Sequence, residues 1–497
     1  MERRDVKRII ALLGIYFMLQ LVVRLCVSPG LELDEAEQIL LTQQFSLGYG
    51  SQPPLYTWLL AGLFRIFGVG IFPLALLKNI LLFSTYLLVY CAGRTLGYDR
   101  GSSVAAMLSL LFIPQIAWES QRDLTHSVLA VTITAATIVC WLKLKRNQAI
   151  SSYILVGLFW GIGILGKYNF GIFLVSLLAA SATIAEYRTL IARPRILYSF
   201  ASMLAVISPH AIWAATHVPV LMTSSGKFKQ AAQGSYAASV FKGTGSLLLA
   251  SISFVGPLLV IYAVIGLRHR KRCWLTSQTK PAPNLLLRTT LFALVICMLM
   301  IILFQVTAFK DRWMQPILFF LPLALSPIVG KFIVHDRFRI VHVLASIAAC
   351  AVLLGLSFRA FLAPYVGTVT RFNLPYNDLV AELGPQVKAA ELVLAQSSLL
   401  GGHIRLRYPT VRVTVPGGAR LYHDSAPGTA LIVWQDDEQQ KKPNDGFWKL
   451  VATVMGDYQP LSPPIPVRAQ FRYLPGRTLS ASSLLVERKP ALAPRLH

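Results

Sequence analysis

The chain has 497 residues, of which 55% are hydrophobic and only 14% are charged, and its formal net charge is +25. Soluble chains carry about a quarter charged residues, so this composition excludes an ordinary soluble domain. The positive charge does not indicate nucleic-acid binding, because the basic residues fall between long apolar runs. That distribution is typical of a multi-pass membrane protein whose basic residues set its orientation and meet anionic lipid.

About eleven apolar runs in the first 360 residues predict a bundle of membrane-spanning helices. We place them at residues 9–27, 71–91, 103–118, 127–141, 153–165, 170–184, 196–214, 246–267, 287–308, 313–329 and 340–364. Several runs are shorter than the roughly 20 residues that a straight span needs, so their ends are approximate.

The connections between these runs alternate along the chain: one is rich in basic residues and the next is poor in them. The N-terminus has Arg3, Arg4, Lys7 and Arg8, and later basic connections include residues 143–146 and 268–272. The positive-inside rule therefore predicts a cytoplasmic N-terminus. An odd number of spans then leaves the C-terminal region on the outer, periplasmic side of a bacterial inner membrane.

The C-terminal region differs from the rest of the chain. Its apolar runs shrink to strand length at residues 391–394, 411–415, 430–434 and 483–486, and residues 377–383 form a short candidate helix. No cysteine follows Cys350, so this region has no disulfide framework and no cysteine-based metal site. We predict a transmembrane domain at 1–365, with amphipathic helices in an outer loop at 28–70. A small periplasmic α/β or α+β domain follows at 366–497.

The outer loop after the first apolar run is acidic at its start. Asp34, Glu35 and Glu37 lie together there, and a double proline at Pro53 and Pro54 leads back toward the membrane. Carboxylates near a membrane are usually paired, solvated in a cavity or functional. An alternative is that Asp34 and Glu37 form a capping box at the start of an amphipathic helix that runs on through Phe45. The two interpretations are compatible.

Other outer connections also combine acidic and basic side chains. The second has Asp123 and His126, the third has Lys167 and Tyr168, and the fifth has Lys310 and Arg312. Each alone is typical of a solvated turn, but together they place acids and bases on one side of one bundle. Transfer of a sugar from a lipid phosphate needs this mixture. A carboxylate takes the proton of the attacking hydroxyl, and Lys or Arg binds the leaving phosphate.

Several other basic residues have simpler explanations. Arg24 lies inside the first apolar run, where we expect its side chain to snorkel to the membrane surface. His403, Arg405 and Arg407 are expected at exposed strand positions, with contact to an anionic acceptor as the alternative. His210 is expected to be structural, because no cluster with metal-ligand spacing accompanies it.

These motifs together resemble the C-class membrane glycosyltransferases that use polyprenyl-phosphate sugars. That group includes protein mannosyltransferases, the aminoarabinose transferase of lipid A and rhizobial lipopolysaccharide-core galacturonosyltransferases. The similarity covers about residues 1–330. The matching elements are Asp34-Glu35-Ala36, the segment from Gln52 to Trp58, the loop with Asp123, and Phe309-Lys310-Asp311-Arg312-Trp313, which is most similar to the galacturonosyltransferase branch.

The resemblance implies an inverting transfer from an undecaprenyl- or dodecaprenyl-phosphate sugar on the periplasmic face. Aminoarabinose transferases have basic residues at two donor-phosphate positions where this chain has Glu37 and Gln52. We therefore assign the donor phosphate to other cations. The resulting assignments are Asp34, Glu35 and Asp123 as catalytic, Lys167, Lys310 and Arg312 as phosphate-binding, and Tyr56, His126 and Tyr168 as substrate-binding.

The expected partners are a polyprenyl-phosphate sugar donor, a lipid or glycan acceptor such as lipopolysaccharide core or lipid A, and membrane lipids, without nucleic acid. The transferred sugar, for which a uronic acid is one candidate, stays open. We assign no metal ligands and no definite cofactor, and a divalent metal stays an open alternative. The main alternative function is a transporter or flippase of an anionic lipid or sugar. Transporters tend to place charge near the membrane midplane and to contain internal repeats, which this sequence lacks.

Overall fold

The computed structural model describes residues 1–219, 235–267, 284–329, 338–417, 427–436 and 445–489. Two compact units are present. The first comprises Met1–Gln20, Ser46–Tyr56 and Leu77–Leu354, and the second comprises Leu21–Phe45, Thr57–Leu76 and Gly355–His497. Each unit is described separately below.

Long apolar helices make up most of the first unit, and some of them continue into the second. Seven helices within the described residues are long and apolar enough to cross a membrane: α1 (Arg3–Val27), α4 (Ile71–Thr95), α7 (His126–Leu144), α11 (Ile196–Thr216), α13 (Tyr236–Leu267), α15 (Leu285–Phe304) and α18 (Phe338–Leu362). In two further cases, two consecutive helices are separated by a short break and bend sharply at that break. One joins the region of α5 (Arg100–Leu108) to Gln115–Arg122, and the other joins α9 (Phe170–Ala182) to α10 (Ala185–Ala192).

Each of the eleven predicted spans coincides with helical structure. The long helices and the bent pairs account for nine, and two shorter apolar stretches, Ile150–Gly166 and Gln315–Ser326, account for the remainder within the described residues. The shorter ones are α8 (Ile150–Gly166) and the segment that contains α16 (Gln315–Leu318) and part of α17 (Leu321–Val329). The predicted class, a polytopic helical bundle, is therefore confirmed. The basic connection predicted at 268–272 lies outside the described residues.

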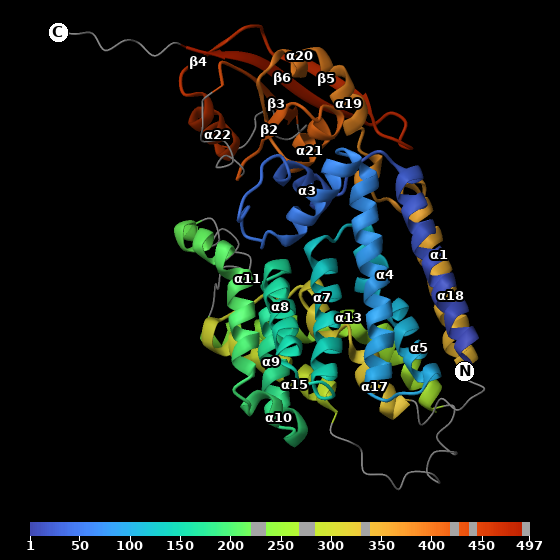
Figure 1. The fold of residues 1–497 in the computed structure, drawn as a ribbon. Coiled ribbons are helices and arrows are strands. Elements are labelled where there is room, and N and C mark those ends of the chain that lie inside the picture. The colour runs from blue at the N-terminus through green and yellow to red at the C-terminus, as the bar shows by residue number, and fades with distance from the viewer. Residues whose placement is uncertain (220–234, 268–283, 330–337, 418–426, 437–444, 490–497) are drawn as a thin grey trace, which may run out of the picture. The chain divides into compact units, whose positions relative to one another are not determined.

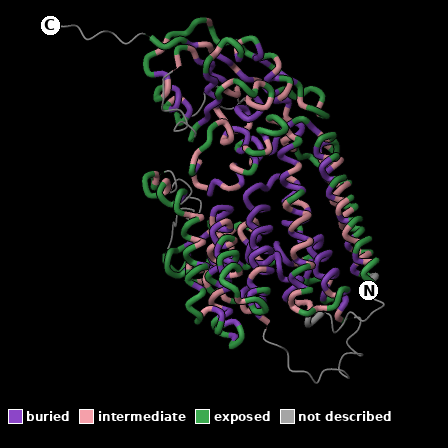
Figure 2. Tube along the Cα trace, viewed as in Figure 1, coloured by how far each residue is buried: buried purple, intermediate pink, exposed green. Residues whose placement is uncertain are grey.

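Helix α7 is an interior helix of this unit, and α8 packs between it and α11 (Figure 1). Most of α7 is buried, whereas α11 keeps a largely exposed surface (Figure 2). Glycines make the α8–α11 approach close: a Cβ on Gly157 would lie 2.0 Å from the Ser199 carbonyl oxygen, and one on Gly161 would lie 2.7 Å from Val206. Their four-residue spacing is the small-residue pattern that lets membrane helices approach closely.

The second unit contains a six-stranded mixed sheet with the order β2-β1-β3-β6-β4, in which β5 also pairs with β6 (Figure 1). The strands are β1 (Leu392–Ala395), β2 (Arg412–Thr414), β3 (Thr429–Asp436), β4 (Tyr458–Pro460), β5 (Ile465–Gln470) and β6 (Thr478–Arg488). β1 is parallel to β2 and β3, and β6 is antiparallel to its three neighbours.

Both faces of this sheet are covered by helices. Alternate residues of β1 point to opposite faces, so Val393 and Leu392 belong to two different apolar clusters. The first cluster includes residues of α19 (Tyr376–Glu382) and α21 (Ser398–Arg407), and the second includes residues of α22 (Asp445–Met455). The predicted α/β character and the four predicted strands are confirmed. The predicted helix at 377–383 is α19, and α20 (Gly384–Ala389) follows it.

The start of the outer loop packs with the C-terminal region inside this second unit. Helix α2 (Leu33–Leu41) lies against α21, and Leu40 is part of the first sheet cluster. A Cβ on Gly402 would lie 2.6 Å from the Ala36 Cβ, so only glycine permits this approach. Gln43 exchanges two side-chain hydrogen bonds with the backbone of Val413, each 2.9 Å long. The domain boundary at 365/366 stays a prediction.

Candidate functional site

A buried ion pair fixes the start of α2. Arg24 donates to both carboxylate oxygens of Glu35, at 3.1 and 2.6 Å, and to the carbonyl oxygens of Ser28 and Gly30. Only 9% of the Arg24 side chain and 1% of that of Glu35 is exposed. The prediction that Arg24 snorkels is therefore wrong, because its guanidinium is satisfied by protein groups. The end of α1 is instead linked directly to α2.

A second carboxylate next to this pair binds two more arginines. Glu32 lies 2.7 Å from Arg359 and 2.8 Å from Arg371. Arg24 and Arg359 both make cation–π contacts with the ring of Phe372, with their guanidinium carbons 4.9 and 4.1 Å from its centroid. Removing one partner of a buried ion pair leaves an uncompensated charge and costs about 3–5 kcal/mol. The network therefore holds α2 in one orientation.

The capping residues of α2 lie two positions earlier than the sequence predicts. Glu32 is the N-cap, and its backbone N–H donates to Glu35 at 3.0 Å, so the reciprocal capping box uses Glu32 and Glu35. The predicted box of Asp34 and Glu37 is wrong, and the helix ends at Leu41, before Phe45. Asp34 therefore lies in the first turn, half-buried, and the adjacent Glu35 is buried and ion-paired.

His403 anchors the segment before α2. The backbone N–H of Leu31 donates to its Nε2 at 3.0 Å, and its Nδ1 donates to the Leu399 carbonyl oxygen at 2.7 Å. The prediction of an exposed strand position is wrong, since His403 lies on α21 and is 1% exposed. Burial and the nearby Arg24 lower the pKa of His403 to about 4, although Leu399 and Glu35 oppose that shift. The imidazole is therefore neutral, as its acceptor role requires.

In the first unit, the second and third outer connections meet around His126. The ring of Tyr56 lies 5.5 Å from that of His126, and Lys167 donates to the hydroxyl of Ser127, the next residue along α7. Tyr56, His126 and Lys167 are all buried. Tyr56 and His126, two of the predicted substrate-binding residues, thus lie close to Lys167, one of the three predicted phosphate-binding residues. Ser127 was not singled out from the sequence.

Asp123 is buried where a short helix, α6 (Ser120–Arg122), ends. Next to it in the chain, Gln121 donates to Asn79 at 3.0 Å, and its carbonyl oxygen accepts from Lys78 at 3.4 Å. Lys78 and Asn79 are buried within α4. The sequence analysis missed Asn79, an uncharged amide inside an apolar run, and Gln121, an uncharged amide among the charged residues of the second outer connection.

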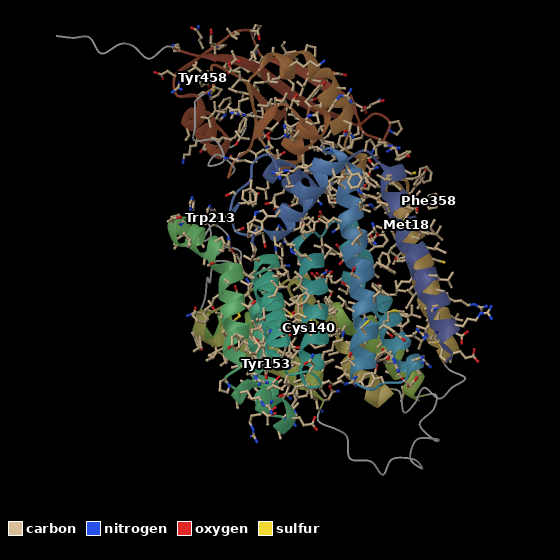
Figure 3. All side chains as sticks on the ribbon, in the orientation of Figure 1. Met18, Cys140, Tyr153, Trp213, Phe358 and Tyr458 are labelled. Carbon is tan, nitrogen blue, oxygen red and sulfur yellow. The ribbon has the colours of Figure 1, made fainter. Side chains whose placement is uncertain are left out.

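Tyr168 belongs to an aromatic row on the same unit. The carbonyl oxygen of Leu47 accepts from His210 Nδ1 at 2.8 Å, so Nε2 is unprotonated and accepts from the Tyr168 hydroxyl at 2.8 Å. The ring of Trp213 on α11 (Figure 3) stacks on His210 and lies where a Cβ of Gly48 would be. His210 is structural here, as the sequence predicts.

The third and fifth outer connections also lie side by side. Asn169 donates to the carbonyl oxygen of Trp313 at 2.9 Å, which places the segment containing Lys167 next to the turn containing Arg312. Lys310 is exposed and Arg312 is half-buried. Lys167, Lys310 and Arg312 therefore lie on connections that share one region of the first unit.

Asp34 belongs to the second unit and these cations to the first, so their proximity stays a prediction. Glu35 is likewise in the second unit, and Asp123 is in the first. Within the described ranges, no group of three or more His, Cys, Asp or Glu side chains could hold a metal ion.

Comparison with known proteins identifies relatives along most of the chain. Residues 51–213 match the family model described as dolichyl-phosphate-mannose-protein mannosyltransferase. Lipopolysaccharide core galacturonosyltransferase RgtA of Rhizobium johnstonii is 33% identical over 87% of both chains. Lipopolysaccharide core galacturonosyltransferase RgtB of the same organism is 35% identical over 83% of both chains.

Solved structures show the same fold at low sequence identity. ArnT from Cupriavidus metallidurans bound to undecaprenyl phosphate has a TM-score of 0.54 and is 13% identical, covering 98% of this chain and 99% of that one. Its apo state has a TM-score of 0.55, again at 13% identity, covering 97% and 98%. The relatives are enzymes, which decides between the transferase and transporter alternatives. The chain belongs to the same family as the two Rhizobium transferases and is a lipid-linked membrane glycosyltransferase of the C class.

Proposed function

We propose that this protein transfers galacturonate from a polyprenyl-phosphate donor to lipopolysaccharide core, or to lipid A, at the periplasmic face of the inner membrane. The main support is the identity of 33% and 35%, over more than four fifths of the chain, to two transferases named for that sugar and acceptor. The lipid-linked donor is supported by the fold neighbour that was solved with undecaprenyl phosphate.

The reaction inverts the anomeric carbon in one displacement. An acceptor hydroxyl gives its proton to a carboxylate while its oxygen forms a bond to the anomeric carbon. The bond from that carbon to the phosphate oxygen breaks, and polyprenyl phosphate leaves with the electron pair. Asp34 is our candidate for the base, because it is half-buried on a fixed helix, while the neighbouring Glu35 is held by Arg24. Asp123, buried in the first unit, is the second acidic candidate.

Glu35 has a positioning role in this proposal. Its two oxygens are occupied by Arg24 and by the backbone of Glu32, so it orients the turn that carries Asp34. The leaving phosphate is assigned to Lys167, Lys310 and Arg312, because cations stabilise the charge that develops as the bond breaks. Tyr56, His126 and Tyr168 are assigned to the substrate, since aromatic rings pack against sugar and prenyl groups.

The proposal is tested with purified protein in lipid nanodiscs, polyprenyl-phosphate galacturonate, and lipopolysaccharide from a strain whose core lacks galacturonate. Mass spectrometry should show one added uronic acid residue per acceptor and free polyprenyl phosphate. The same carrier bearing a neutral hexose serves as the control donor. Transfer of the hexose alone would contradict the galacturonate assignment. Absence of transfer from either donor would contradict the reaction itself.

A further inference from the structure

Three amide side chains, two of them buried and one half-buried, surround one short turn of the first unit. Gln115 donates to the carboxylate of Asp311 at 2.5 Å, and Gln315 donates to the Gln115 carbonyl oxygen at 3.0 Å. Asn169 donates to the carbonyl oxygen of Trp313 at 2.9 Å. Asp311, Trp313 and Gln315 all lie within five consecutive residues. We call Gln115, Asn169 and Gln315 the amide cluster.

The hydrogen bonds of the amide cluster determine how each side chain is oriented. Each of the three NH₂ groups donates to an oxygen that can only accept, a carboxylate for Gln115 and a backbone carbonyl for the other two, and the Gln315 group also donates to the Ser120 hydroxyl at 3.3 Å. Rotating any of these amides by half a turn would bring two acceptor oxygens together. The atoms whose hydrogen bonds are still to be accounted for are therefore the three side-chain carbonyl oxygens.

Those three oxygens have no hydrogen-bond partner among the described residues. The buried atoms are Gln115 Oε1, Gln315 Oε1 and Asn169 Oδ1. Gln315 is completely buried, and Gln115 is 7% exposed. Buried acceptors without a partner are costly and are rare in native proteins, so three of them around one turn indicate a missing donor.

The backbone of this region is also unusual. Gln115–Glu119 forms a π-helical turn, at a break where the helical pair bends by 74°. π-helical turns are rare and are frequent at functional sites. In membrane proteins, a broken helix is tolerated where it is buried in protein or lines a water-filled cavity.

We propose that the amide cluster is a subsite that binds the hydroxyl groups of a sugar ring and so selects the sugar. Its free atoms are all acceptors, which suits hydroxyl donors and excludes an ionised phosphate or carboxylate as the direct partner. A sugar ring offers several hydroxyls at adjacent carbons, which matches several acceptors around one turn. This inference rests on the proposed function and names the residues that recognise the sugar.

The test compares two ligands that differ only in the sugar: polyprenyl-phosphate galacturonate and bare polyprenyl phosphate. Their affinities are measured by titration calorimetry on the full chain in nanodiscs. Gln315→Leu and Asn169→Leu should weaken binding of the sugar-bearing donor on the order of tenfold per lost hydrogen bond, with bare carrier binding unchanged. Thr137→Val is the matched control, because Thr137 Oγ1 is also buried without a described partner but lies within α7. It should leave both affinities unchanged.

A ligand-side experiment covers the case in which a variant does not fold. Donor analogues lacking one ring hydroxyl should bind the wild-type protein about tenfold more weakly, and combining an analogue with Gln315→Leu should cost less than the sum of the two changes. If donor affinity is unaffected but the KM for the lipopolysaccharide acceptor rises, the sugar bound here belongs to the acceptor.

Folded variants that change neither affinity nor acceptor KM would overturn the subsite. The failure of the proposed function has a different signature, namely wild-type protein that binds the donor but transfers no galacturonate.

Discussion

At the scale of single residues, Asp34 and Glu35 are adjacent on α2 but have different surroundings. Glu35 is 1% exposed and accepts hydrogen bonds from Arg24 and from the backbone of Glu32. Because both of its oxygens are occupied, this carboxylate cannot approach an acceptor hydroxyl. Asp34 is half-buried and projects from the same turn. These surroundings support our proposal that Asp34 carries the chemistry and Glu35 positions it.

Replacing Asp34 by Asn should reduce turnover by a factor of about 10² to 10⁴, because the amide cannot take up a proton at neutral pH. Donor affinity and the thermal unfolding midpoint should stay close to those of wild type. Turnover is measured as galacturonate transfer by purified protein in nanodiscs.

The control for this prediction is Asp378→Asn. Asp378 is exposed and lies in the first turn of α19, so the variant removes an equivalent helix-terminal charge in the same unit. Its turnover should stay within about twofold of wild type. Near-normal turnover of Asp34→Asn would remove Asp34 from the catalytic step.

At the scale of elements, α2 is held mainly by packing against the C-terminal region of the second unit. Leu40 contributes to the apolar core beneath the sheet, and Gly402 allows α21 to approach Ala36. The ion pair between Arg24 and Glu35 joins α2 to the end of α1. A helix of nine residues has little stability by itself, so its orientation depends on these contacts.

Substituting Gly402 by Ala should displace α2 and so lower turnover. The added Cβ would lie 2.6 Å from the Ala36 Cβ and 3.0 Å from its carbonyl oxygen, which neither partner can avoid without a backbone shift. Overpacking of this kind costs about 1–3 kcal/mol. Thermal unfolding and turnover should both decrease.

Gly62→Ala provides the comparison, because Gly62 lies within α3 (Leu55–Phe67) and no atom lies within 4 Å of its added Cβ. Alanine is the better helix former, so this variant should be as stable as wild type or slightly more stable. Equal turnover in Gly402→Ala and wild type would show that the close packing of α2 on α21 does not matter for catalysis.

At the scale of the whole molecule, stability should depend on pH through His403. Its ordinary pKa of 6.5 falls to about 4 in the folded protein, chiefly because of burial. The unfolded chain therefore binds a proton below pH 6.5 while the folded protein does not. The stabilisation from neutral His403 is complete above pH 6.5 and is lost as the pH falls toward 4, by up to about 3 kcal/mol.

The measurement is thermal unfolding of the full-length protein between pH 8 and pH 4. The wild-type midpoint should fall across pH 6.5 to 4, and His403→Gln should be less stable at pH 8 but show a shallower decrease. Parallel curves for the two proteins would contradict the assignment of this pH dependence to His403.

Much of the architecture could be predicted from the pattern of residues. Long apolar runs have few stable solutions beside lipid, so each predicted span became helix. The short length of the apolar runs in the C-terminal region likewise predicted β1, β2, β3 and β6. The sequence was less informative where charge is buried. Arg24 looked like a snorkelling side chain and His403 like an exposed one, because the sequence does not show which distant group will pair with a polar residue.

By itself, then, the sequence determined the membrane class, the positions of the spans and the acidic motif at Asp34, because apolar length and charge distribution act locally along the chain. Only the tertiary structure decided that Glu35 is paired with Arg24, that α2 packs on α21, and that Gln115, Asn169 and Gln315 surround one turn. The physical reason is that these side chains find their partners on other elements, 11 positions away for Arg24 and Glu35 and between 144 and 200 positions away for the amide cluster. Their partners become defined only once the helices have packed.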